Sequence, residues 1–79
     1  MTTDPAGATD FAEHYANGAL KMRGFHLAGE MHGNWAWFRT DGSVMRIGQF
    51  DRGRQVGVWK TFDRTGRLVT ETDFGPGSA

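Results

Sequence analysis

The sequence contains no cysteine, only two prolines and no excess of charge of either sign. Without cysteine, the chain cannot form disulfides, cysteine-ligated zinc sites or a thiol nucleophile. Nine basic and nine acidic residues cancel to a formal net charge of zero, whereas binding to nucleic acid or to an anionic membrane needs clustered Lys and Arg. No apolar run approaches the roughly 20 residues of a membrane helix, and residues 1–5 lack the layout of a signal peptide. We therefore expect a cytoplasmic protein that binds no nucleic acid and no membrane.

Glycine and aromatic residues are abundant instead. The 79 residues include 12 glycines, six phenylalanines, three tryptophans and one tyrosine, enough for one small domain with a modest core. Glycine at this frequency beside aromatic residues indicates many tight turns between short strands.

Glycine, tryptophan and phenylalanine recur at a fixed offset of 24 residues, as Gly18, Gly42 and Gly66 illustrate. The same offset relates Leu20 to Val44 and Leu68, Gly24 to Gly48, Gly29 to Gly53 and Gly77, Gly33 to Gly57, Trp35 to Trp59, and Phe38 to Phe62. The chain is therefore about two and a half copies of one unit.

Each unit contains two turn candidates. Asn17-Gly18, Asp41-Gly42 and, more weakly, Thr65-Gly66 predict two-residue type I′ hairpin turns, because both central positions tolerate positive φ. Ala28-Gly29 and Arg52-Gly53 predict type I turns closed by a glycine bulge. One unit is then one β-hairpin.

The predicted fold is all-β: a single-layer antiparallel meander of about six strands built from 24-residue hairpin repeats, which dimerisation would complete. The strands are expected near 10–16, 19–27, 33–40, 43–51, 57–64 and 67–74. A short helix over Asp10 to Tyr15 is the alternative to the first strand. We expect the repeat domain to span 10–74, between disordered tails at 1–9 and 75–79.

A two-residue turn at Asp41-Gly42 pairs Trp35 with Gly48, and the equivalent turn at Asn17-Gly18 pairs Phe11 with Gly24. We expect each ring to cover the bare backbone of the glycine opposite it.

Alternation along the strands sorts the side chains onto two faces. The more apolar face is expected to carry Phe11, Tyr15, Leu20, Met22, Trp35, Trp37, Val44, Phe50, Trp59, Leu68 and Phe74. The mixed face is expected to pair Phe38 with Met45 and Phe62 with Val69, and to include Phe25 and Ile47.

A lone sheet of this size has a face of roughly 700 Å², close to the ~800 Å² per partner of a standard interface. The tryptophan-bearing face is therefore expected to pack against a partner, either another protein or a second copy in a homodimeric sandwich. The alternative is that twist curls the sheet over its own rings. The tryptophans are accordingly either core anchors or an interaction patch, and the arginines near the turns either solvate the sheet or recognise an acidic partner. The predicted partner-binding residues are Trp35, Trp37, Trp59, Phe50, Phe74, Arg52 and Arg54.

Signals for catalysis or metal binding are weak. His14, His26 and His32 lack the spacing of a zinc motif, even with Glu30 beside them. Ser43 and Ser78 are expected in a turn and a tail, which makes a serine nucleophile improbable. Asp41, Asp51 and Asp63 fall at predicted turns and strand ends, where aspartate normally forms local hydrogen bonds. We expect no enzyme activity, no metal and no cofactor.

The units FAEHYANGALKMRGFHLAGEMHGNWAWF and FRTDGSVMRIGQFDRGRQVGVWKTFDRTGRL resemble MORN-type repeats of the bacterial variant over residues 11–74. The matching residues are Phe11, Tyr15, Asn17, Gly18, Leu20, Gly24, Gly29, Gly33 and Trp35, then Phe38, Asp41, Gly42, Gly48, Gly53, Gly57, Trp59 and Phe62, then Gly66 and Leu68. Members of this variant include YwqK-type antitoxins, so the resemblance implies an immunity-like module that binds a toxin. Other MORN proteins imply a structural, oligomerising unit or a lipid-headgroup binder.

Overall fold

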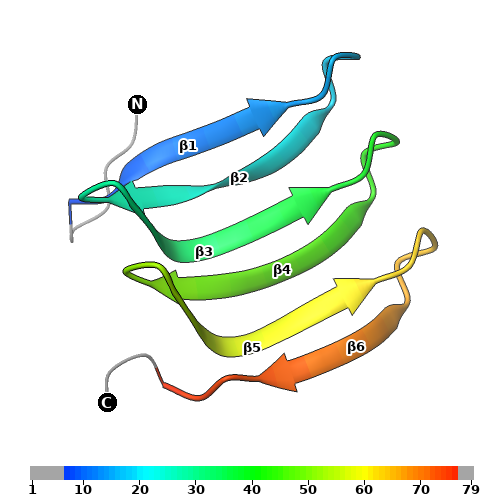
Figure 1. Ribbon diagram of the computed structural model, residues 1–79. Coiled ribbons are helices and arrows are strands. Elements are labelled where there is room, and N and C mark those ends of the chain that lie inside the picture. The colour runs from blue at the N-terminus through cyan, green and yellow to red at the C-terminus, as the bar shows by residue number, and fades with distance from the viewer. Residues whose placement is uncertain (1–6, 77–79) are drawn as a thin grey trace.

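The computed structural model describes residues 7–76 and contains one sheet of six antiparallel strands in sequence order (Figure 1). The strands are β1 Thr9–His14, β2 Leu20–Leu27, β3 Glu30–Phe38, β4 Val44–Asp51, β5 Arg54–Phe62 and β6 Leu68–Asp73. The predicted single-layer antiparallel meander is therefore confirmed. A short helix over Asp10 to Tyr15 was the alternative to the first strand. These residues instead form β1 and the start of the turn after it, so the helix is wrong.

Disordered tails were predicted at 1–9 and 75–79, and of these, residues 1–6 and 77–79 lie outside the described residues. Within the described part, Thr9 already belongs to β1. Gly75 accepts a hydrogen bond from the Gly57 amide at 2.7 Å, which extends the pairing beyond the end of β6. Across residues 7–76, no helix is long and apolar enough to cross a membrane.

The turns at Asn17-Gly18 and Asp41-Gly42 are not the predicted type I′ turns. Gly18 and Gly42 have positive φ, whereas Asn17 and Asp41 do not. The Gly18 amide donates to the Tyr15 carbonyl at 2.9 Å, and the Tyr15 amide donates to the Ala19 carbonyl at 2.8 Å. This pattern is a three-residue loop that begins as a type I turn and ends with a left-handed glycine. The Asx side chain serves the turn differently, because Asn17 Oδ1 accepts from the Ala19 amide at 2.9 Å.

A bulge next to each of these loops restores the predicted register. The pairing shifts between Trp37 and Phe38, so that Trp37 lies opposite Arg46 while Phe38 lies opposite Val44, which leaves Met45 as the extra residue. The loop has three residues instead of the predicted two, and the strand after it contains one extra residue at the bulge. The two changes cancel, so the register beyond the bulge is the predicted one. Trp35 consequently pairs with Gly48 as expected.

The bulge also moves residues from one face to the other. Phe38 pairs with Val44 rather than Met45, and Phe62 pairs with Leu68 rather than Val69. Val44 and Leu68 therefore lie on the face opposite the tryptophans, which corrects the predicted sorting, and Leu20 follows them by pairing with His14.

The turns at Ala28-Gly29 and Arg52-Gly53 are the two-residue turns, again contrary to the prediction. Ala28 and Arg52 both have φ of 51°, and each is followed by a glycine with φ above 80°. They join the directly paired residues Leu27 and Glu30, and Asp51 and Arg54. Two consecutive left-handed residues are the signature of a type I′ turn, here built without Asn or Asp.

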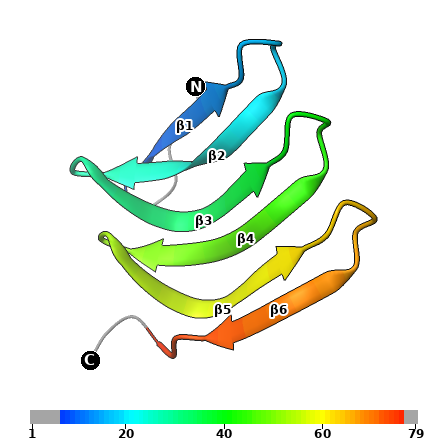
Figure 2. The ribbon, with the colours of Figure 1, turned by 45° about the vertical axis from the view of Figure 1, so that its right-hand side comes forward.

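Strands β3 and β5 bend sharply near their starts (Figure 2). Between the pairs Phe25–His32 and Arg23–Ala36, β2 advances by two residues and β3 by four. Gly33, with φ of 79°, lies in the extra stretch, and Gly57, with φ of 71°, lies at the equivalent point of β5. Both strands were predicted to begin at these glycines. They begin three residues earlier, because the glycines bend the strands instead of preceding them.

Candidate functional site

A continuous group of rings covers one side of the sheet, called here the tryptophan face. Each ring lies within about 6 Å of the next, from β1 through β3 to the segment after β6. The rings are Phe11, His26, Trp35, Trp37, Phe50, Trp59 and Phe74.

Trp35 and Trp59 are the buried members, exposed by only 2% and 3%. Each indole lies on a buried glycine: Trp35 on Gly24 of β2 and Trp59 on Gly48 of β4. A Cβ built at either glycine would overlap the indole ring carbons. The tryptophans therefore pack against the neighbouring hairpin of their own chain. The rings predicted to cover these glycines, Phe11 and Trp35, are their backbone partners, but the covering ring comes from one hairpin further along.

The indole N–H groups fix these rings in place. Trp35 Nε1 donates to the Phe25 carbonyl at 3.1 Å, and Trp59 Nε1 donates to the Gln49 carbonyl at 3.2 Å. These two acceptors are 24 residues apart, as are the two donors. A buried indole with its N–H satisfied is a stable core group, because no polar atom is lost from water without a partner.

The remaining part of the face, called here the rim, stays in contact with solvent. Trp37 and Phe50 are half-buried, Arg46 is exposed and Phe74 is 45% exposed. The guanidinium carbon of Arg46 lies 4.7 Å from the centroid of the Trp59 ring and 5.8 Å from that of Trp37, which is cation–π geometry. Arg46 thus covers the outer side of a buried indole while remaining accessible.

The other side of the sheet, called here the opposite face, mixes apolar and charged side chains and is more open. One complete row crosses all six strands: Ala12, Arg23, Ala36, Ile47, Lys60 and Glu71. Val44 and Val58 are each 37% exposed and Leu68 is 45% exposed. Ile47 lines two shallow hollows, one with Phe25, Ala36 and Val58, and the other with Val44 and Phe62.

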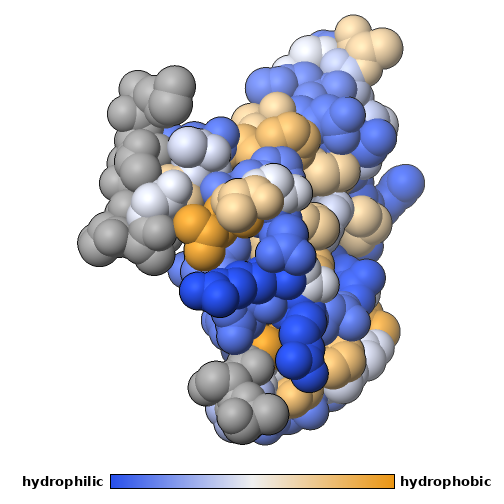
Figure 3. Space-filling view, turned by 60° about the vertical axis from the view of Figure 1, so that its left-hand side comes forward, coloured by the Kyte–Doolittle hydropathy of each residue, from blue (hydrophilic) through white to orange (hydrophobic). Residues whose placement is uncertain are grey.

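From the side that carries the β2–β3 and β4–β5 turns, hydrophobic residues alternate with strongly hydrophilic ones and form no single large patch (Figure 3).

Charge is distributed unevenly between the strands. The two edge strands carry four acidic residues, Asp10 and Glu13 in β1 and Glu71 and Asp73 in β6, and neither contains Lys or Arg. The lysines and arginines lie in β2, β4 and β5 and in the turns.

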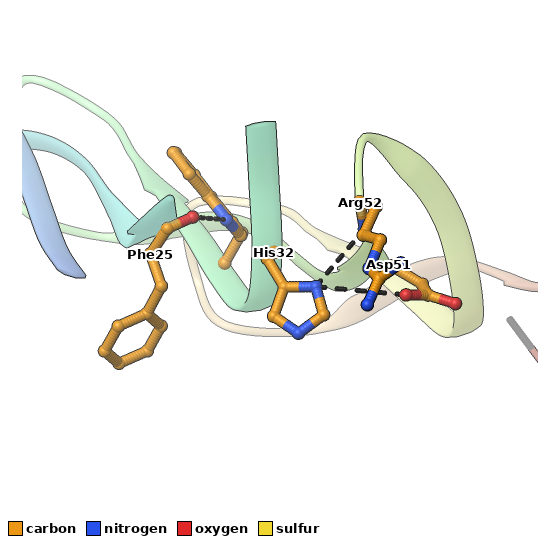
Figure 4. Close-up of polar contacts among 5 residues, drawn as sticks. Phe25, His32, Asp51 and Arg52 are labelled. Carbon is orange, nitrogen blue, oxygen red and sulfur yellow. Dashed lines mark hydrogen bonds and ion pairs between the residues drawn. The ribbon is translucent and has the colours of Figure 1, made fainter. Parts of the chain in front are cut away.

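Arg52 lies in the β4–β5 turn and Arg54 directly follows it, and neither joins the rings. Both are exposed. The Arg52 amide donates to His32 Nδ1 at 3.2 Å, so His32 holds this turn against β3 (Figure 4). Asp51 Oδ1 lies 3.9 Å from the same nitrogen. Among residues 7–76, neither arginine contacts an aromatic ring through its guanidinium.

At the opposite ends of the hairpins, two turn carboxylates accept several hydrogen bonds. Side-chain and backbone donation from Ser43 lowers the pKa of Asp41 below its ordinary value of 3.8. The hydroxyl of Thr65, followed by the Arg67 amide, lowers the pKa of Asp63 in the same way. These carboxylates stabilise turns. Within the described part of the chain, no group of three or more histidine, aspartate or glutamate side chains is placed to hold a metal ion.

The structure thus brings five of the seven predicted partner-binding residues together, namely Trp35, Trp37, Phe50, Trp59 and Phe74, and leaves Arg52 and Arg54 apart. Two of the five are core residues whose rings are covered by the chain itself. Arg46 was missed, although the predicted register already placed it opposite Trp37.

No family model matches this chain, and neither does any curated protein or solved structure.

Proposed function

We propose that the protein is a non-enzymatic protein–protein interaction module and that the rim of the tryptophan face is its contact surface. The observation that carries the proposal is an accessible group of Trp, Phe and Arg side chains on a sheet with no second layer in the described chain. These residue types supply most of the energy at protein interfaces. The buried Trp35 and Trp59 support the rim as a rigid platform, so a partner would order few side chains on binding.

The opposite face is the second candidate, because Val44, Val58 and Leu68 are exposed there. Aliphatic residues are under-represented among the side chains that dominate binding energy, and Lys60 and Arg23 interrupt this surface. Composition therefore favours the rim over the opposite face.

A matched pair of variants separates the two surfaces. Phe74→Asp places a charge on the rim, and Val58→Asp places one on the opposite face at a residue of similar exposure. The immobilised full chain is used to capture proteins from its native cell, followed by quantitative mass spectrometry, with circular dichroism to verify folding. We expect a saturable partner that binds the wild type and Val58→Asp and is lost with Phe74→Asp.

The reverse pattern would assign the contact to the opposite face. Absence of any saturable partner, including a second copy detected by light scattering, would contradict the interaction role altogether.

The resemblance to YwqK-type antitoxins supports a toxin as the class of partner. This prediction is tested by co-expressing the protein with the toxic product of a neighbouring gene. Rescue of growth by the wild type but not by Phe74→Asp is the expected result, and equal rescue by both would contradict use of the rim.

A further inference from the structure

We infer that Arg46 is a preformed receptor for a carboxylate that a partner protein presents to the tryptophan face. This inference rests on the proposed function and names the chemistry of the partner group that binds at the centre of the rim. It starts from the position of Arg46 in β4, where its backbone neighbours are Trp37 on one side and Thr61 on the other.

The Arg46 guanidinium is held by rings rather than by an anion. Its carbon lies 4.7 Å from the Trp59 centroid, and Trp59 is itself fixed by its indole hydrogen bonds and by Gly48. A guanidinium stacked on an aromatic ring keeps its N–H groups free at the edges of its plane. Part of the side-chain entropy that binding would cost is therefore lost already on folding.

The guanidinium of Arg46 has unused hydrogen-bonding capacity. Across residues 7–76, its N–H groups make no hydrogen bond and no ion pair. Arg39 provides the contrast, because it donates to Ser43 Oγ at 3.3 Å, to the Val44 carbonyl at 3.2 Å and to the Phe62 carbonyl at 2.5 Å. Arg39 joins two hairpins, whereas Arg46 has the same donors without an acceptor.

The residues next to Arg46 suit a carboxylate. In the backbone register, Arg46 pairs with Thr61 and Thr61 with Thr70, so two hydroxyls follow the guanidinium along one row of this face. Directly paired residues have Cβ atoms about 5 Å apart, close enough for a hydroxyl and a guanidinium to bind the same acid. In that row the acidic residue is Glu13, at the β1 edge and separated from Arg46 by Met22 and Trp37.

A carboxylate accepts two parallel N–H bonds from a guanidinium, which a partially desolvated site strengthens. Because the guanidinium is flanked by indoles, the partner residue would place its acid at Arg46 and apolar neighbours on Trp37 and Phe50. The occupant is therefore a protein segment with an Asp or Glu beside apolar residues.

The test uses hexaglutamate as the probe, titrated into the ¹⁵N-labelled full chain at low salt and followed by NMR. Hexaglutamine serves as the neutral control, and inorganic phosphate tests the other oxyanion source. We expect hexaglutamate to shift the Arg46 Nε–H and the Trp59 and Trp37 indole signals, and hexaglutamine to shift none of them.

Arg46→Gln should weaken hexaglutamate binding by about tenfold or more, since it removes a charge-assisted bidentate contact. Arg46→Lys keeps the charge but loses the planar fork, so we expect an intermediate loss of about threefold to tenfold. Arg54→Gln removes one positive charge from the exposed start of β5, away from the rings, and should change the affinity less than twofold. Unchanged dispersion of the indole signals verifies that each variant is folded.

Equal affinity of Arg46→Gln and wild type would overturn the inference, as would an equal loss with Arg54→Gln, which would indicate a general charge effect. Shifts with phosphate but not with hexaglutamate would also overturn it, in favour of a phosphoryl ligand. Failure here, with partner capture still lost on Phe74→Asp, would leave the proposed function intact.

Discussion

The two faces of this single-layer sheet differ in how completely they bury their apolar side chains. On the tryptophan face, the indoles of Trp35 and Trp59 fold down onto glycines of the neighbouring hairpin and leave the solvent almost completely. On the opposite face, Val44 and Val58 stand apart and stay more than one-third exposed. An indole ring can be buried against a glycine because the glycine has no side chain in the way, whereas an isolated valine on an open face stays exposed. We infer that stability depends mainly on the first face.

The largest expected effect on stability comes from adding a side chain to a glycine that lies under an indole. Gly48→Ala places a methyl group where the Trp59 ring lies, so the ring must move or the strands must separate. We expect the free energy of unfolding to fall by about 3 kcal/mol, as for an overpacked core. Urea denaturation measures the change.

Gly66→Ala is the control for this substitution, because the new Cβ would meet no atom within 4 Å and only the positive φ of 91° opposes it. It should cost about 1 kcal/mol. Equal losses for the two variants would contradict the role assigned to Gly48.

Trp59 and Val58 are adjacent in β5 and lie on different faces, so substitutions at these two residues compare the contributions of the two faces to stability. Trp59→Phe removes ring area and the indole N–H that bonds to the Gln49 carbonyl, and should cost about 2 kcal/mol. Val58→Ala, one residue away on the opposite face, should cost about 1 kcal/mol or less because Val58 is already 37% exposed. A larger loss at Val58 than at Trp59 would reverse the assignment of the core.

The β2–β3 turn offers a gain in stability that is independent of both faces. Ala28 has φ of 51°, a conformation that Asn adopts at less cost. Ala28→Asn should therefore raise the free energy of unfolding by about 0.5 to 1 kcal/mol. Gly29→Ala, whose new Cβ would contact nothing, should lower it because φ is 84° there. The expected gain and loss are measured by thermal and urea unfolding.

The smallest expected effect concerns pH. Hydrogen bonds from Thr65 and Arg67 lower the pKa of Asp63 in the folded protein below 3.8. Its contribution to stability is therefore present above pH 3.8 and is lost as the pH falls through the lowered pKa. Asp63→Asn keeps an acceptor but cannot titrate, so its stability should depend less steeply on pH in this range. A ¹³C-detected titration of Asp63 with a pKa at or above 3.8 would contradict this expectation.

The sequence predicted the strand number, the meander order and the pairing of Trp35 with Gly48, yet it assigned the two kinds of turn the wrong way round. The pairing was correct because a longer loop and a one-residue bulge at Met45 cancel. Asn-Gly and Asp-Gly suit both turn types, so the dipeptide alone could not decide between them. Nor could it reveal that Ala28 and Arg52 accept a left-handed backbone.

The sequence pattern also could not identify which rings cover the glycines. Register gives the backbone partner of each glycine, but the tryptophan side chain extends across to the neighbouring hairpin. The bends at Gly33 and Gly57 make this possible, and a glycine that bends a strand is hard to distinguish in sequence from one that precedes a strand. For the same reason the buried Trp35 and Trp59 could not be separated from the accessible Trp37.

Tryptophan fluorescence of the dilute protein tests the central claim most directly, namely that the chain covers its own indoles and leaves only the rim for a partner. A blue-shifted emission maximum, unchanged on dilution to concentrations at which light scattering detects only monomer, is the predicted result. Emission typical of water-exposed indole in the folded monomer, shifting to the blue only as a second copy or another protein binds, would contradict it.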